Sequence, residues 1–151
     1  MQNTGEINST IPFVPLWGGL LGLLPFWALA LIGSMNWIGS SIVVFNYLAN
    51  YAALIVTFTG AIWWGLALSH SSMSVRNLLF TWSLIPCLLA WSALALPTAK
   101  ALWALAFLLL LQLLMDYMFL WRRRLIVYWV WCFRRLLTVI AVPSLVLATL
   151  Q

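Results

Sequence analysis

The sequence predicts an all-α fold, a polytopic transmembrane helical bundle with about five transmembrane helices. Two observations predict it. The chain is 66% hydrophobic and only 6% charged, whereas about a quarter of the residues in a soluble domain are charged. Residues 7–69, 77–99 and 101–115 also contain no Asp, Glu, Lys, Arg or His. Because roughly 20 helical residues span a bilayer core of about 30 Å, these runs are long enough to cross a membrane several times.

The domain organisation follows from the same pattern. Residues 1–11 are polar and too short to fold alone, so we expect a flexible N-terminal tail there. Residues 12–151 are predicted to form a single transmembrane bundle domain, because no later polar stretch is long enough for a separate soluble domain.

The first two helices are predicted over residues 12–32 and 41–68. Prolines suit the start of the first helix, where a missing N–H has no consequence, and Pro25 should kink its interior. A turn rich in Gly, Ser and Asn ends it. The second helix is longer than a bilayer requires and should therefore tilt or protrude.

Small residues mark candidate helix-packing positions on these two helices. Gly18 and Gly22 form a GxxxG pattern on the first, and Gly60 and Gly65 lie on the second. Small residues let two membrane helices approach closely. We therefore expect helix–helix contacts at these four positions.

Three more helices are predicted over residues 76–96, 101–121 and 125–150. A turn beginning at Pro97 separates the first two, and the basic turn Arg122–Arg124 separates the last two. The sequence leaves open whether residues 125–133 cross the membrane or lie in its interface, because aromatic residues in that segment suit either place.

The positive charges are distributed unevenly between the two sides of the predicted bundle. Five helices place the termini on opposite sides, with six arginines on the N-terminal side and Lys100 on the other. The positive-inside rule then predicts an N-terminus in the cytoplasm and a C-terminus outside. Arg122, Arg123 and Arg124 could also contact anionic lipid headgroups, although topology alone accounts for them equally well.

Asp116 is the one acidic residue outside the N-terminal tail. A charge at membrane depth is unfavourable unless it is paired, so we expect an ion pair with Arg134 or Arg135 that joins the last two helices. Gln112 lies one turn earlier on the same face and could hydrogen-bond to Asp116 or to another helix. A proton-relay or headgroup-binding role for Asp116 is the functional alternative.

The sequence supplies little chemistry for catalysis. It contains a single histidine, His70, and two separated cysteines, and no catalytic or nucleotide-binding motif. We therefore expect no enzyme activity, no metal site and no cofactor. An enzyme acting on lipid, with Asp116 and His70 as an acid–base pair, is the remaining catalytic alternative.

Several short motifs carry a resemblance to a known family. They are Gly60-Ala61-Ile62-Trp63-Trp64-Gly65, Trp82-Ser83-Leu84-Ile85-Pro86, Gln112 with Asp116, and Tyr128-Trp129 with Arg134-Arg135. Their order over about residues 12–145 resembles the bacterial family called domain of unknown function 3429, whose relatives include mitochondrial transmembrane protein 69 of animals. The family often has His or Arg where this chain has Trp63.

The resemblance implies a bacterial inner (cytoplasmic) membrane protein, with the mitochondrial inner membrane as the alternative, and no assigned reaction. We expect a non-enzymatic accessory or assembly subunit of a larger membrane complex, with respiratory complexes among the candidates. Its partners would be the lipid bilayer and a membrane protein or a second copy of the chain, and no nucleic acid. The alternative is a binder or transporter of an apolar or amphipathic molecule such as a quinone or lipid, because Pro25, Pro86 and Pro143 could open a cavity.

Overall fold

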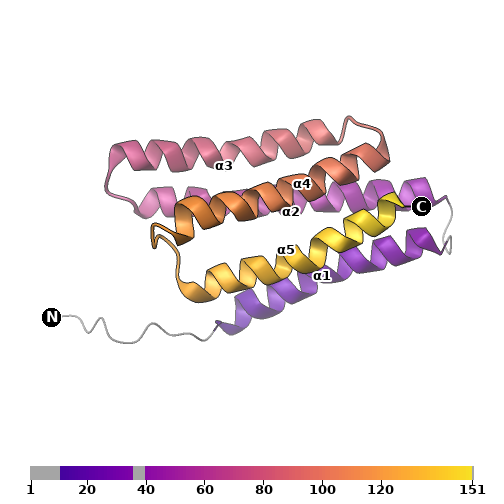
Figure 1. The fold of residues 1–151 in the computed structure, drawn as a ribbon, viewed down its shortest axis with the longest axis horizontal. Helices are drawn as coiled ribbons and strands as arrows, with labels where there is room; N and C mark the ends of the chain where they lie inside the picture. Colours follow the sequence, from indigo (N-terminus) through magenta and orange to yellow (C-terminus); the bar gives the residue numbers. More distant parts are fainter. Residues whose placement is uncertain (1–10, 36–39, 151) are drawn as a thin grey trace.

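The computed structural model describes residues 11–35 and 40–150 of the chain. Its described part is all-helical and contains no strand, which confirms the predicted fold class. The expected tail, residues 1–11, lies outside the described residues except for Ile11. The elements in chain order are α1 (Phe13–Ser34), α2 (Ser41–Ser69), α3 (Met73–Ala93), α4 (Thr98–Met115), η1 (Asp116–Trp121) and α5 (Tyr128–Thr149) (Figure 1).

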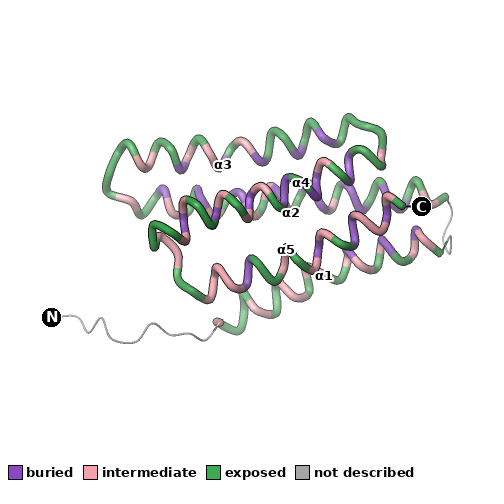
Figure 2. Tube along the Cα trace, viewed as in Figure 1, coloured by how far each residue is buried: buried purple, intermediate pink, exposed green. Residues whose placement is uncertain are grey.

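The five long helices run antiparallel along one axis, so α1 begins and α5 ends at opposite ends of the bundle (Figure 1). The helix α2 packs against α1, α3 and α4, and α5 packs against α1 and α4. All five spans are long and apolar enough to cross a membrane. Buried residues face the interior and exposed residues cover the outside (Figure 2). The chain is therefore a polytopic membrane protein whose exposed apolar side chains face lipid.

Some helix boundaries differ from the sequence prediction. The third helix begins at Met73 instead of residue 76, because Ser72 is extended and serves as its N-cap residue. The fourth begins at Thr98 instead of residue 101, directly after the extended Pro97. The fifth begins at Tyr128, so residues 128–133 continue a spanning helix and residues 125–127 form the connection before it.

The core has two parts. The larger part includes residues of all five long helices and is rich in alanine, with Leu48, Leu105 and Leu145 fully buried among the small side chains. Small residues allow close helix approach where no hydrophobic effect drives association. The second part lies near the end of α2 and consists of the buried residues Trp63, Ala67, Leu79 and Leu120.

The predicted packing glycines occupy different environments. Gly60 lies where α2 meets α3 and α4, and a Cβ added there would come within 3.2 Å of Gln112 and 3.3 Å of Pro86. A Cβ on Gly22 would lie 3.7 Å from the Tyr51 hydroxyl. A Cβ added at Gly18 or Gly65 would meet no atom within 4 Å, so these two glycines make no close helix contact in this chain.

A close contact of α1 with α5 involves a glycine that the GxxxG pattern does not include. A Cβ on Gly19 would overlap the ring of Phe133. Gly19 lies beside Gly18 in the sequence but faces α5, because neighbouring residues in a helix point about 100° apart. The close approach of α1 and α5 therefore depends on the residue next to the GxxxG pattern.

Candidate functional site

Asp116 and Arg134 form a buried ion pair between the end of α4 and α5. The Nε atom of Arg134 donates to Oδ2 of Asp116 at 2.8 Å, and its Nη2 atom lies 2.5 Å from the same oxygen. Asp116 is 2% exposed and Arg134 is 8% exposed. Arg135, the other partner that the sequence allowed, is exposed and makes no ion pair with Asp116 in the described part of the chain.

The second carboxylate oxygen of Asp116 is also occupied. The indole Nε1 of the buried Trp63 on α2 donates to Oδ1 of Asp116 at 2.7 Å. Sequence reasoning gave Trp63 no polar role. The signal that could have drawn attention to it is the indole N–H itself, because a buried Trp usually has a hydrogen-bond acceptor.

Gln112 and Thr59 extend the polar network along α2. The Gln112 amide donates to the carbonyl oxygen of Val56 at 2.9 Å and accepts from the Thr59 hydroxyl at 2.5 Å. Arg134 reaches the Thr59 carbonyl oxygen through Nη1 at 3.4 Å. The network therefore ties three helices together, because Val56, Thr59 and Trp63 lie on one face of α2 and Gln112 and Asp116 are one turn apart.

A single turn of π-helix begins at Asp116. It spans Asp116–Trp121, and the N–H of Arg122 donates to the carbonyl oxygen of Tyr117 at 3.0 Å, five residues earlier. Such turns are rare and often occur at functional sites. The extra residue in this turn changes the direction in which later side chains point. The chain then leaves the helix through Arg124, which has a positive φ of 55°.

An apolar cavity of about 570 Å³ lies beside this network, between α1, α2 and α5. Its walls include glycines of α1 and apolar side chains of α2 and α5, among them Gly18, Gly19, Gly22, Phe58, Ile62 and Phe133. The polar side chains in the wall are Thr59, Arg134 and Thr138. Because Thr59 and Arg134 belong to both, the cavity and the buried polar network form one site.

The cavity wall contains none of the three prolines that the sequence linked to a cavity. Pro25, Pro86 and Pro143 do not line it, and Pro86 instead packs where a Cβ on Gly60 would lie. These three prolines therefore supply none of the cavity wall, and their effect on the cavity through helix bending stays a prediction. On α1 the wall includes Gly18 and Gly22, which have no side chain to fill the space.

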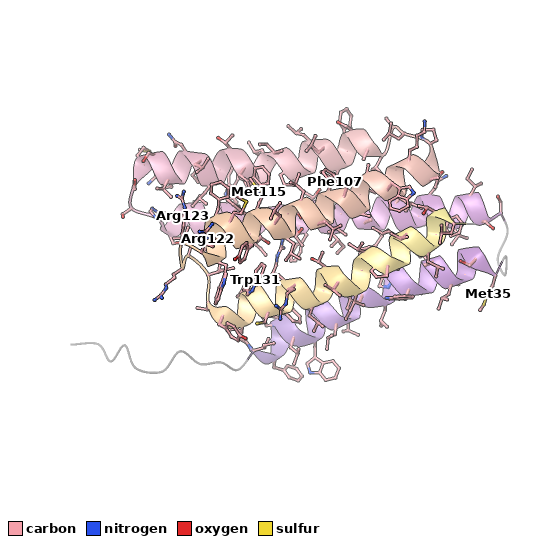
Figure 3. The ribbon with its side chains drawn as sticks, viewed as in Figure 1. Met35, Phe107, Met115, Arg122, Arg123 and Trp131 are labelled. Atoms are coloured by element: carbon pink, nitrogen blue, oxygen red, sulfur yellow. The ribbon has the colours of Figure 1, made fainter. Side chains whose placement is uncertain are left out.

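The remaining candidate residues lie elsewhere. Arg122, Arg123 and Arg124 are exposed, and Arg122 and Arg123 lie at the end of the bundle where α3 begins (Figure 3). The Arg123 guanidinium lies 5.3 Å from the centre of the Phe119 ring. The Nδ1 of His70 accepts from the N–H of Ser72 at 3.3 Å. Within residues 11–35 and 40–150 no group of His, Cys, Asp and Glu side chains could hold a metal ion.

The fold and site define the class of protein: a polytopic helical membrane protein with a buried ionic network beside an apolar cavity. The chain belongs to the family described as "Protein of unknown function (DUF3429)", whose model matches residues 11–150. This match confirms the family that the sequence motifs indicated. No curated protein and no solved structure matches the chain. A relation to mitochondrial transmembrane protein 69 stays a prediction.

Proposed function

We propose that the protein binds an apolar or amphipathic small molecule, such as a quinone or lipid, in the cavity between α1, α2 and α5. The observation that carries this proposal is the cavity of about 570 Å³ with the buried Arg134 in its wall. Sites for small molecules commonly measure about 300–1,000 Å³ and are mostly apolar with a few placed polar groups. The described cavity has these properties.

The walls of the cavity reach the outer surface of the bundle, which supports entry from the bilayer. Val14 and Phe58 both line the cavity and are 77% and 71% exposed. In a membrane these side chains face lipid. A molecule dissolved in the bilayer can therefore enter sideways, without crossing a polar surface.

The arrangement of Asp116 favours binding over catalysis. One of its oxygens accepts from Trp63 and the other from Arg134, and Asp116 does not line the cavity, so its carboxylate joins helices and does not face a molecule bound there. His70 interacts with Ser72 in the connection between α2 and α3. This supports a non-enzymatic role over an acid–base pair of Asp116 and His70.

The test is the amount of ligand that is purified with the protein. Native mass spectrometry of protein extracted gently from membranes should show a stoichiometric small molecule. Gly18→Leu should reduce it strongly, because the new side chain enters the cavity and its Cβ meets no atom within 4 Å. Gly65→Leu is the matched control, since Gly65 has equally open space and does not line the cavity. Equal ligand content in both variants would refute the proposal.

As a second function we propose that the protein is an accessory or assembly subunit of a larger membrane complex, with respiratory complexes among the candidates. The alternative assembly is a homo-oligomer. The observation that favours it is Asn50, which is exposed on α2 and whose amide has no hydrogen-bond partner in the described part of the chain. Ala61 and Gly65 are exposed on the same face. An unpaired amide facing lipid favours association with another helix, and small residues allow its close approach.

Native electrophoresis of mildly solubilised membranes tests this second function. Asn50→Leu should convert a larger assembly into the single chain, whereas Asn77→Leu, at an exposed position near the start of α3, should leave the assembly unchanged. A wild-type protein that migrates as a monomer and crosslinks to no membrane protein would contradict this function.

We also propose a location and an orientation. The chain would lie in a bacterial inner membrane, with its N-terminus in the cytoplasm and its C-terminus outside. The mitochondrial inner membrane is the alternative location. The supporting observation is that Arg122–Arg124 and the start of α3 with Arg76 lie at one end of the bundle, while Lys100 is in the first turn of α4 at the other end. Loops rich in Arg and Lys stay in the cytoplasm.

A further inference from the structure

We infer that the ligand has an uncharged head with a carbonyl oxygen, which accepts hydrogen bonds from Arg134 and Thr138, and an apolar tail that lies along α1 and α5. This inference rests on the proposed binding function and names the chemical class of the ligand. Quinones and the ester groups of diacyl lipids share this chemistry.

Thr138 supplies the first observation. It lines the cavity and is only 7% exposed, yet its hydroxyl makes no hydrogen bond within the described residues. Several other helical hydroxyls in this bundle donate to a carbonyl oxygen of the preceding turn, as Thr57 does to Ala53 at 3.0 Å and Ser144 to Ala141 at 2.7 Å. Buried polar groups are normally paired. The Thr138 hydroxyl is therefore available to a molecule in the cavity.

Arg134 supplies the second observation. A guanidinium carries five N–H donors. In the described structure Nε and Nη2 are directed to Asp116 and Nη1 to the Thr59 carbonyl oxygen, which leaves two N–H groups without a partner. Arg134 and Thr138 are one helical turn apart, and both line the cavity. Together they place unused donors on one strip of an otherwise apolar wall.

The charge of the site selects a neutral head. Asp116 already balances Arg134, so the buried pair has no net charge. An anionic or cationic head would introduce an unbalanced charge at membrane depth, which is unfavourable. A carbonyl oxygen accepts from both donors and introduces no charge. An alkyl chain without a polar group would leave the donors of Arg134 and Thr138 unpaired.

The shape of the cavity provides room for a tail. On α1 the lining runs from Val14 to Phe26, and on α5 it runs from Trp129 to Ala141. At 1.5 Å per residue each of these segments is about 18 Å long. Arg134 lies near the middle of the α5 segment, so a head bound there leaves apolar wall for a tail along the helices.

The experiment measures binding to the full chain in lipid nanodiscs by quenching or shift of tryptophan fluorescence, since Trp129 lines the cavity. The probes are a decyl-substituted benzoquinone, a dioctanoyl glycerol and decylbenzene, which has a tail but no carbonyl. We expect the wild type to bind at least one carbonyl probe more tightly than decylbenzene. Thr138→Val should weaken the affinity for that carbonyl probe by about tenfold, the usual effect of losing one hydrogen bond. The affinity for decylbenzene should not change. Thr57→Val, at a helical threonine outside the cavity lining, should change neither.

The outcomes separate this inference from the function on which it rests. Preferred binding of the quinone identifies a quinone-type head, and preferred binding of the glycerolipid identifies an ester carbonyl. Equal binding of decylbenzene and both carbonyl probes to the wild type would overturn the inference while leaving the binding function intact. Failure of all three probes to bind would refute the binding function itself. The comparison of probes on the wild type decides the inference even where Thr138→Val does not fold.

Discussion

Replacing Asp116 by Asn tests whether the ion pair with Arg134 stabilises the bundle. The amide keeps the size of the carboxyl group but removes its charge, so Arg134 stays buried without a counter-ion. Removing one partner of a buried ion pair costs about 3–5 kcal/mol, and an Arg at the centre of a membrane helix costs about 2.5–3.5 kcal/mol. We therefore expect Asp116→Asn to lower the free energy of unfolding by about 3 kcal/mol.

The double variant Asp116→Leu with Arg134→Met removes both charges together. No ion is then left unpaired, so its loss of stability should be smaller than the sum of the two single variants. The assay is reversible unfolding in mixed micelles with increasing sodium dodecyl sulfate, followed by helical circular dichroism. Arg135→Gln, an exposed position on the same helix, serves as the control and should change stability by less than about 0.5 kcal/mol.

Two results would refute this reasoning. One is an Asp116→Asn protein that unfolds at the wild-type detergent fraction, because the pair would then contribute no stability. The other is a double variant whose loss equals the sum of the single losses, because the two charges would then act independently. Either result would indicate that Arg134 reaches water or lipid headgroups in place of Asp116.

Three further predictions concern the packing, the network and the orientation. Gly19→Ala should lower the free energy of unfolding by about 1–3 kcal/mol, because its methyl group overlaps Phe133. Gly18→Ala should raise it by up to about 1 kcal/mol, because Ala favours a helix and the new methyl group meets no atom within 4 Å. The same detergent titration measures both. Trp63→Phe should lower stability by about 1–3 kcal/mol, because Oδ1 of the buried Asp116 loses its donor; a loss equal to that of an exposed Trp91→Phe control would contradict this. Replacing Arg122–Arg124 by Gln should move a C-terminal reporter enzyme to the cytoplasm in part of the molecules; an unchanged reporter signal would count against their role in orientation.

Much of the fold follows from solvation alone. A charge-free run long enough to span a bilayer has few alternatives to a membrane helix, so the five spans can be read from the sequence. Asp116, at membrane depth, also requires a nearby cation, and the short connection before α5 brings the arginines of that helix near it. Whether that cation is Arg134 or Arg135 depends on the rotation of α5 about its axis. Side-chain packing sets this rotation. One such contact is that of the Phe133 ring on α5 with Gly19 on α1.

The cavity and the details of the polar network could not be predicted. The contact of Trp63 with Asp116 joins residues 53 positions apart, and no local pattern marks it. The π-turn at Asp116 has no characteristic sequence signal. The cavity depends on where α1 lies relative to α2 and α5, and the free hydroxyl of Thr138 is meaningful only once that cavity is known. Tertiary geometry determines each of these features.

The ion pair also has a consequence for biosynthesis. Asp116 and Arg134 are 18 residues apart along the chain, so Asp116 leaves the ribosome before its counter-ion does. During that interval Asp116 has no counter-ion, although Trp63, which donates to it in the folded chain, has already been made. We therefore expect the two helices to enter the lipid together, as a hairpin whose opposite charges cancel.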